Sequence, residues 1–275
     1  MAVVNYRHAF HAGNFGDCVK HVVLVWLLRA LQRKPAPLCV LDTHAGVSRY
    51  DLNTGPAART EEWRSGIGRL LDHPPPLLAD YVGLVQSLGL YPGSPAIAHG
   101  LLRPDDRLIC CELHPQDAAI LRRHFAGDAQ VAVHHRDAWE ALGALLPPQQ
   151  RRGLVLIDPP FEDPQEFVTL ARGLATGWQR FRTGVFAAWY PIKQRGPIRQ
   201  FLADMKQSGV RDIVTAELCL REPVDPVRLN GCGILVVNPP YRFEQELPAI
   251  LTALLGRLGD REQAEAVAVR RIVDE

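Results

Sequence analysis

Apolar residues occur along the chain as short runs that end at a polar residue, and these runs predict the strands of a sheet. Seven such runs are present, at 38–42, 107–112, 131–133, 153–158, 184–190, 213–220 and 234–238. They are nearly continuous rather than alternating, which is typical of parallel strands covered on both faces. Stretches with helical periodicity separate most of them. The chain therefore predicts an α/β fold with a mostly parallel, seven-stranded sheet.

One long stretch interrupts this alternation. Between Asp42 and Arg107 no run resembles a strand, and helical patterns at 60–71 and 77–88 are split by three consecutive prolines. A crossover between parallel strands needs far fewer residues. We therefore expect a single domain, residues 1–275, with a small helical insertion at roughly 50–95 after the first strand. A substrate-side lid or platform fits this position, and so does a surface excursion without function.

Composition limits the class of protein but does not identify it. Hydrophobic residues make up 47% and charged residues 22%, as in an ordinary soluble globular protein. The net charge of +1 predicts no general affinity for nucleic acid, so any such surface must be local. Six cysteines without C-x-x-C spacing indicate a reduced, cytoplasmic protein without a zinc site. The apolar run at 22–28 is too short to cross a bilayer, and we expect no membrane partner.

Carboxylates follow the first four predicted strands. Asp42, Glu112 and Asp158 each end a run, and Asp137 follows the third run by a few residues. The carboxyl ends of parallel strands meet at one edge of a sheet, and ligands bind in the crevice there. The turn after the first strand contains Gly46 but lacks the glycine pattern of dinucleotide-binding folds, which disfavours an NAD enzyme.

The order of these acids instead favours S-adenosylmethionine as the cofactor. Asp42 suits its cationic amino acid end, and Glu112 suits the two ribose hydroxyls. Asp137 is placed to accept a hydrogen bond from the amine of the cofactor's adenine. Asp158 lies one strand further along, where it would reach the methyl group.

The segment Asp158-Pro159-Pro160-Phe161 is the predicted reaction centre. An exocyclic adenine amine is a weak nucleophile because its lone pair is delocalised into the ring. A carboxylate that accepts a hydrogen bond from this amine favours a pyramidal, nucleophilic nitrogen, and the carbonyl of Pro159 offers a second acceptor. Phe161 offers a ring on which a base can stack. Catalysis then depends mainly on alignment, since a methyl sulfonium needs no activation.

The same consensus occurs a second time, at Asn238-Pro239-Pro240-Tyr241. Two copies cannot both form the centre of one site. We interpret the second copy as a structural turn, because it ends the last predicted strand, which we expect toward the far edge of the sheet.

Together with the N-terminal blocks 5–14 and 17–21, these segments resemble a known family. Further segments that carry the resemblance are 41–46, 91–95, 112–115, 157–161, 189–191 and 238–240. They run in order over nearly the whole chain. The family is ribosomal RNA large subunit methyltransferase J, which methylates the N6 amine of one adenosine in 23S ribosomal RNA.

The resemblance implies a Rossmann-like class I methyltransferase with a helical insertion, acting as a monomer on protein-free 23S ribosomal RNA or an early assembly intermediate. Matching positions imply that the residues lining the cofactor are His21, His44, Ser94, Glu112, Asp137, Ala138 and Asp158. They further imply Asp158 as the catalytic residue and Tyr6 as a contact to RNA, besides Pro159 and Phe161 at the substrate. Two departures are Phe161, where tyrosine is usual, and Ala138, where the family has glycine.

Rival functions share parts of this pattern. A DNA adenine or a protein glutamine amide would use the same chemistry, although no separate base-reading domain is visible. A non-catalytic, cofactor-binding RNA module would keep the fold without methyl transfer. Basic residues in the second half of the chain suit either phosphate contacts or an ordinary solvated face, so they do not decide between these functions.

Overall fold

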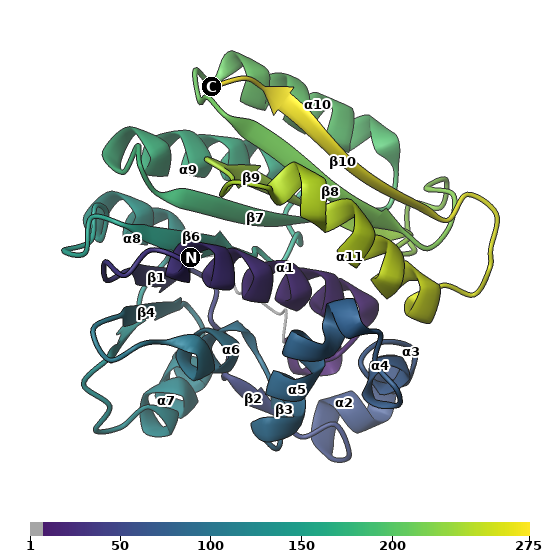
Figure 1. The fold of residues 1–275 in the computed structure, drawn as a ribbon, viewed down its shortest axis with the longest axis horizontal. Helices are drawn as coiled ribbons and strands as arrows, with labels where there is room; N and C mark the ends of the chain where they lie inside the picture. The colour runs from purple at the N-terminus through teal and green to yellow at the C-terminus, as the bar shows by residue number, and fades with distance from the viewer. Residues whose placement is uncertain (1–7) are drawn as a thin grey trace.

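A computed structural model of the chain describes residues 8–275, and its central sheet has eight strands (Figure 1). The strand order is β10-β8-β9-β7-β6-β1-β4-β5. The strands are β1 (Cys39–Asp42), β4 (Arg107–Glu112), β5 (Val131–His135), β6 (Gly153–Ile157), β7 (Val185–Ile192), β8 (Ile213–Cys219), β9 (Gly231–Val237) and β10 (Ala266–Val273). From β5 to β7 the pairs are parallel, whereas β9 is antiparallel to β7 and β8, and β10 is antiparallel to β8. The predicted α/β class and mostly parallel sheet are confirmed.

The predicted count of seven strands is wrong by one, because the sequence pattern misses β10. This strand lies at the edge of the sheet and pairs with β8, and most of its side chains, including Arg270 and Arg271, are exposed or half-buried. An edge strand with charged residues lacks the continuous apolar run that marks a buried strand. The separate ribbon of β2 (Arg49–Tyr50) and β3 (Tyr91–Pro92) has only two residues a strand, which is too short to leave a pattern.

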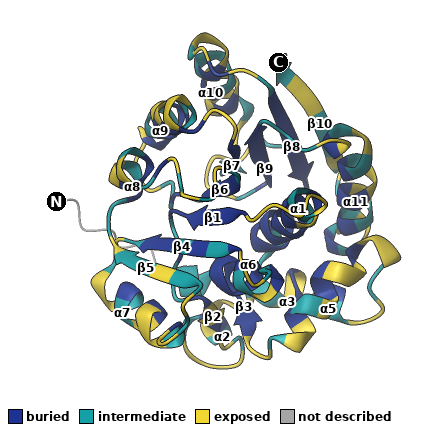
Figure 2. Cartoon of the chain, turned by 60° about the vertical axis from the view of Figure 1, so that its left-hand side comes forward, coloured by how far each residue is buried: buried dark blue, intermediate teal, exposed yellow. Residues whose placement is uncertain are grey.

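Helices cover both faces of the sheet (Figure 2). One face carries α1 (Phe15–Gln32), α6 (Ser94–Leu101), α7 (Pro115–His124) and α11 (Phe243–Leu258). The other face carries α8 (Ala138–Ala144), α9 (Glu166–Arg180) and α10 (Arg195–Gln207). Each face has its own apolar core, with Leu24 and Leu251 buried in the first and Leu142 and Phe201 buried in the second. Burial of these two layers is the main source of stability.

The stretch from residue 51 to 90, called the helical segment below, lies beside α1 and α6 (Figure 1). It contains α2 (Gly55–Thr60), α3 (Glu62–Ser65), α4 (Gly68–Leu71), the 3-10 turn η2 (Pro76–Leu78) and α5 (Ala79–Ser87). Its buried side chains, such as Leu70 and Tyr81, join the α1 core. The single-domain boundaries and the 50–95 insertion stay predictions.

The helical segment also fixes the residues that lead into α1, which follow the short 3-10 turn η1 (His8–Phe10). The amide of Ile67 donates to the carbonyl of Gly13 over 2.8 Å. A Cβ on Gly66 would meet the same carbonyl oxygen at 2.0 Å, so only glycine allows this close approach. Residues 11–14 are therefore packed against the helical segment before α1 begins.

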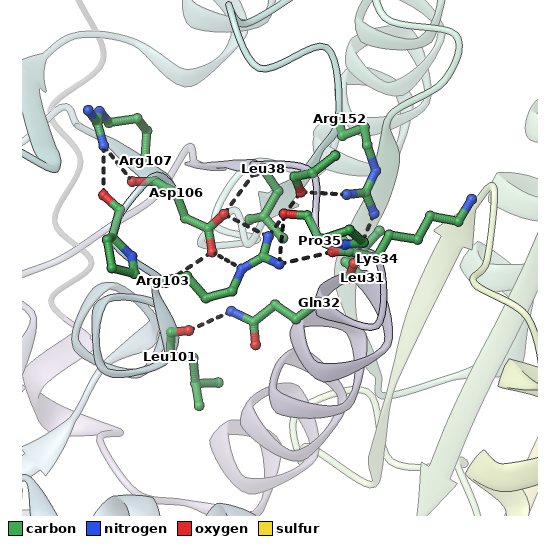
Figure 3. A network of polar contacts seen from close by, with 12 residues as sticks. Leu31, Gln32, Lys34, Pro35, Leu38, Leu101, Arg103, Asp106, Arg107 and Arg152 are labelled. Atoms are coloured by element: carbon green, nitrogen blue, oxygen red, sulfur yellow. Dashed lines mark hydrogen bonds and ion pairs between the residues drawn. The ribbon is translucent and has the colours of Figure 1, made fainter.

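A polar network stabilises the edge of the sheet where β1 and β4 begin, opposite to the edge where these strands end (Figure 3). The fully buried Asp106 accepts hydrogen bonds from the amide of Leu38 and the guanidinium of Arg103, each over 2.9 Å. Arg103 and Arg152 both donate to the carbonyl of Ala36, in the link between α1 and β1. Arg152 therefore has a structural role at an edge away from the predicted reaction centre.

Candidate active site

The predicted strand-end acids gather at the edge where β1, β4, β5, β6 and β7 end. Asp42 and Glu112 are the last residues of β1 and β4, Asp158 directly follows β6, and Asp137 begins α8 after β5. Burial is the main cause of the raised pKa of Asp42 and of the lowered pKa of His44, and the charge of Asp158 acts on both groups, as that of Asp137 does on His44. The structure thus brings the four acids to the same edge of the sheet, as their order in the sequence predicts.

Lys20 lies at the centre of this edge, although the sequence did not single it out. Its Nζ is 2.6 Å from Oδ2 of Asp158 and 2.8 Å from Oδ1 of Asp17, and its side chain is only 5% exposed. Burial acts to lower the pKa of Lys20, but the two carboxylates outweigh it and raise this pKa well above its usual value. Lys20 therefore stays charged and holds one carboxylate oxygen of Asp158.

A second layer of contacts holds Asp17 in turn. Its Oδ2 lies 2.9 Å from Nε2 of His8 and accepts a hydrogen bond of 2.9 Å from the amide of Gly13. Burial acts to raise the pKa of Asp17, but His8 and Lys20 hold it well below its usual range. Two buried charges three residues apart on an otherwise apolar helix are a signal that could have identified Lys20, since buried charges need partners.

His44 connects the turn after β1 to the reaction centre. The amide of Asp158 donates to Nδ1 of His44 over 3.3 Å, and the hydroxyl of Thr43 donates to the carbonyl of Leu156 over 3.0 Å. Burial lowers the pKa of His44 to about 4, so its ring is neutral at physiological pH. The cofactor-side turn and the predicted catalytic segment are thus tied together by hydrogen bonds.

Glu112 and Asp137 also organise backbone amides around the crevice. Glu112 accepts hydrogen bonds from the amide of Gly46 over 2.8 Å and from that of His114 over 2.7 Å, while burial raises its pKa. Asp137 caps α8 by accepting from two amides through Oδ1. Ala138, the first residue of this helix, is buried. Each carboxylate keeps lone pairs for a ligand hydroxyl or amine.

Oδ2 of Asp42, at the end of β1, and Nε2 of His21, in α1, are among seven buried side-chain polar atoms of residues 8–275 that have no hydrogen-bond partner. Burial raises the pKa of Asp42 to about 6, although the nearby Ser94 hydroxyl acts to lower it. Burial lowers the pKa of His21 to about 3. A buried polar atom without a hydrogen-bond partner costs free energy. The open carboxylate oxygen of Asp42 and the open ring nitrogen of His21 therefore indicate a polar ligand.

Phe161 forms part of an aromatic wall beside Asp158. Its ring centroid lies 4.9 Å from that of Phe167 and 6.0 Å from that of Trp189, and its side chain is half-buried. Pro159 is buried. Tyr6, the predicted RNA contact, lies outside the described residues.

The second copy of the consensus lies at the opposite edge of the sheet. Because β9 is antiparallel to β7, with Val237 paired to Phe186, Asn238 lies where β7 begins rather than where it ends. Its side-chain amide donates to the carbonyls of Arg182 and Gly184, each over 2.7 Å. The predicted separation is therefore observed, but the reason given for it was wrong. In the strand order β9 lies between β8 and β7 and is not an outermost strand. The copies are separated by strand direction, because β9 runs antiparallel to β7, which is parallel to β6.

Residues 8–275 contain no cluster of three or more histidine, cysteine or acidic side chains arranged to hold a metal ion. Within the same range, none of the helices has the length and apolar character that a membrane crossing requires.

Comparison with known proteins gives strong matches over most of the chain. A sequence profile for the family described as Ribosomal RNA large subunit methyltransferase D, RlmJ, matches residues 35–270. Ribosomal RNA large subunit methyltransferase J of Escherichia coli (strain K12) is 40% identical over 264 residues, which cover 93% of this chain and 94% of that protein. The protein of the same name from Haemophilus influenzae is 39% identical, and the match covers 92% of this chain and 93% of that protein.

Solved structures agree with the sequence matches. A protein from Legionella pneumophila str. Philadelphia 1 aligns with a TM-score of 0.86 at 34% identity, covering 95% of this chain and 98% of that one. A probable spermidine synthase from Corynebacterium glutamicum aligns with a TM-score of 0.51 at 15% identity, covering 96% of this chain and 77% of that one. At that identity the second likeness concerns the fold alone.

Proposed function

The chain belongs to the family of ribosomal RNA large subunit methyltransferases, and from this premise we propose that it transfers a methyl group from S-adenosylmethionine to the N6 amine of one adenosine in 23S ribosomal RNA. The observation that carries this proposal is the position of Asp158. It follows β6 at the crevice edge, its Oδ2 is held by the buried Lys20, and its neighbours include a proline carbonyl and an aromatic wall.

The residues at the crevice fit S-adenosylmethionine. Its amino acid end carries an ammonium and a carboxylate, which suit the open Oδ2 of Asp42 and the open Nε2 of His21. Glu112 would accept from the ribose hydroxyls, and Asp137 from the amine of the cofactor's adenine, with the backbone of Ala138 beside it. The remaining proposed contacts are His44, Ser94 and Asp158. When bound, the cofactor supplies a methyl group on a positively charged sulfur.

Asp158 would orient the target amine rather than remove its proton first. Lys20 engages Oδ2, which leaves Oδ1 to accept a hydrogen bond from the N6 amine. The carbonyl of Pro159 would accept the second N–H, and Phe161 would stack on the adenine ring. With the amine held by Asp158 and the Pro159 carbonyl, its lone pair would point at the methyl group that the cofactor supplies as an electrophile, and the proton that N6 loses after the transfer would leave along the hydrogen bond to Oδ1 of Asp158. Alignment in a site that excludes water supplies most of the rate.

The substrate and setting are part of the same proposal. We infer a monomer in the cytoplasm that acts on protein-free 23S ribosomal RNA or an early assembly intermediate. Unstacking a base costs least in loops and ends, so a single-stranded adenosine is the expected target. Tyr6 would contact this RNA, and the helical segment would form a platform on the substrate side.

Nucleoside mass spectrometry of 23S ribosomal RNA from a deletion strain tests the proposal directly. We expect the loss of one N6-methyladenosine, its return with the wild-type gene or with Asn238→Ala, and no return with Asp158→Ala. An unchanged ribosomal RNA profile with methylation lost from DNA or from a protein glutamine would favour those substrates instead. Full methylation by the Asp158→Ala protein would overturn the mechanism.

A further inference from the structure

His21 is held from one side only, by a tyrosine on a different part of the chain. Its Nδ1 lies 3.0 Å from the hydroxyl of Tyr91, while its Nε2 has no hydrogen-bond partner in residues 8–275. The whole side chain of His21 is buried. A buried nitrogen left open in this way points to a ligand.

Tyr91 is itself held by a second buried tyrosine. The hydroxyls of Tyr91 and Tyr81 are 3.3 Å apart, and both rings lie against the imidazole of His21, at centroid distances of 5.8 and 6.3 Å. Tyr81 belongs to α5 of the helical segment and Tyr91 to β3 directly after it, whereas His21 belongs to α1. Burial raises the pKa of both tyrosines well above its usual value, so both keep their protons.

The chemistry of these groups favours one direction for the hydrogen bonds. Burial lowers the pKa of His21 to about 3 despite the nearby Asp17, so the ring is neutral and carries one proton. A phenol is a stronger donor than an imidazole N–H, and an imidazole nitrogen is a stronger acceptor than a phenol oxygen. We therefore expect Tyr91 to donate to Nδ1 of His21 and to accept from Tyr81. The single imidazole proton would then lie on Nε2, which would act as a donor.

The position of this donor suggests what it binds. His21 follows Lys20, which reaches Asp158, and Tyr91 precedes Ser94, whose hydroxyl lies near Asp42. The open nitrogen of His21 and the open oxygen of Asp42 share a neighbour, because the charge of Lys20 acts on the pKa of both groups. An α-amino acid group presents a carboxylate and an ammonium, which match a donor and an acceptor respectively.

We propose that Tyr91, supported by Tyr81, is a positioning residue that holds His21 as the Nε2–H tautomer so that it donates to the carboxylate at the amino acid end of the cofactor. This inference rests on the proposed function. It makes the helical segment part of the cofactor site, because a residue of α5 completes the chain of hydrogen bonds. At metal sites, removing the group that orients a ligating histidine through its other ring nitrogen commonly weakens the affinity for the metal about ten- to a hundredfold. We use this range as the scale for the effect expected here.

Two measurements test the inference, one of which needs no cofactor. Nitrogen NMR of the ligand-free wild-type protein should show the proton of His21 on Nε2 and none on Nδ1 between about pH 6 and 8. Calorimetric titration with S-adenosylhomocysteine should show binding weakened about tenfold by Tyr91→Phe and about twofold by Tyr81→Phe. Tyr190→Phe is the matched control, since its buried hydroxyl donates to Glu217 over 2.9 Å and does not contact His21.

The outcomes separate this inference from the proposed function. A wild-type spectrum with the proton on Nδ1 overturns the tautomer and the role of Tyr91, even if Tyr91→Phe cannot be purified. Wild-type affinity in the Tyr91→Phe protein, or an equal loss in Tyr190→Phe, overturns the inference alone. A wild-type protein that binds no S-adenosylhomocysteine overturns the proposed cofactor and this inference together.

Discussion

The two copies of the [DN]-P-P-aromatic consensus share residue types, yet they occupy opposite edges of one sheet. Asp158 follows β6 and faces the crevice, where Lys20 reaches it from α1. Asn238 follows the antiparallel β9 and faces the start of β7, where its amide joins two backbone carbonyls. Asp158 presents a hydrogen-bond acceptor that a cation holds in place, whereas the amide N–H groups of Asn238 donate to the backbone.

The aromatic residues of the two copies differ in how far they are buried. Phe161 packs between Phe167 and Trp189, whereas Tyr241 is 85% exposed. Phe161 and Asn238 both adopt a positive φ of 52°, so a left-handed residue occurs in both turns and does not separate them. The direction of the preceding strand and the charges around the first residue decide whether this consensus can do chemistry.

Exchanging the first residues of the two copies should give the largest effect. Asp158→Asn weakens the acceptor and leaves Lys20 short of one partner, so we expect single-turnover methylation to fall by about 100- to 1000-fold. Asn238→Asp places a carboxylate against two carbonyl oxygens, so we expect a loss of about 1–2 kcal/mol in the free energy of unfolding, measured in urea. Activity per folded Asn238→Asp molecule should stay within about twofold of wild type, on the general experience that surface changes away from a site leave it intact. A larger loss of activity in Asn238→Asp than in Asp158→Asn would invert the assignment.

The sequence was sufficient for the parallel half of the molecule. Continuous apolar runs mark β1, β4, β5 and β6, and the acids that end or follow them mark the crevice, because both features depend on local order along the chain. The edge strand β10 was missed, since exposed residues such as Arg270 interrupt its pattern. The direction of β9 was also not visible, because an apolar run does not state which way its strand points.

Contacts between distant elements were likewise beyond the sequence. Lys20 and Asp158 are 138 residues apart, and nothing in either neighbourhood indicates that they meet. The contact between His21 and Tyr91 spans 70 residues and requires the helical segment to fold against α1. Only the spacing of Asp17 and Lys20 on an apolar helix could have suggested a buried charge cluster.

Lowering the pH should affect the edge of the sheet at Asp158 more than the edge at Asn238. The first edge carries carboxylates that titrate, whereas the second does not depend on a carboxylate at position 238. Burial raises the pKa of Asp42 from its ordinary 3.8 to about 6, so in the free protein this group lowers stability as pH rises from about 4 to 6. The ionised form would bind the cofactor's ammonium, so protonation competes with binding. We expect affinity for S-adenosylhomocysteine to weaken up to about tenfold per pH unit below about 6.

Calorimetry between pH 5 and 8 measures this profile, provided that the protein stays folded by circular dichroism over the range. Asp42→Asn should bind more weakly at pH 8 and show a much flatter profile, because it removes the titrating group. Asn238→Ala should reproduce the wild-type profile. A steep profile that survives in Asp42→Asn would assign the titration to another group.

The aromatic positions should give the smallest effects, and they test whether stacking separates the two copies. Phe161→Leu keeps an apolar side chain but removes the ring, so the KM for RNA should rise about fivefold, the lower end of what one base–aromatic stack contributes. Phe161→Tyr restores the residue usual in the family and keeps the ring, so we expect a change below about threefold. Tyr241→Leu should leave the KM unchanged, because that ring is exposed at the far edge. Since all three proteins keep Asp158, kcat should stay near wild type in each. A fall in kcat without a change in KM for Phe161→Leu would instead mean that the ring aligns the amine and does not contribute to binding of the base.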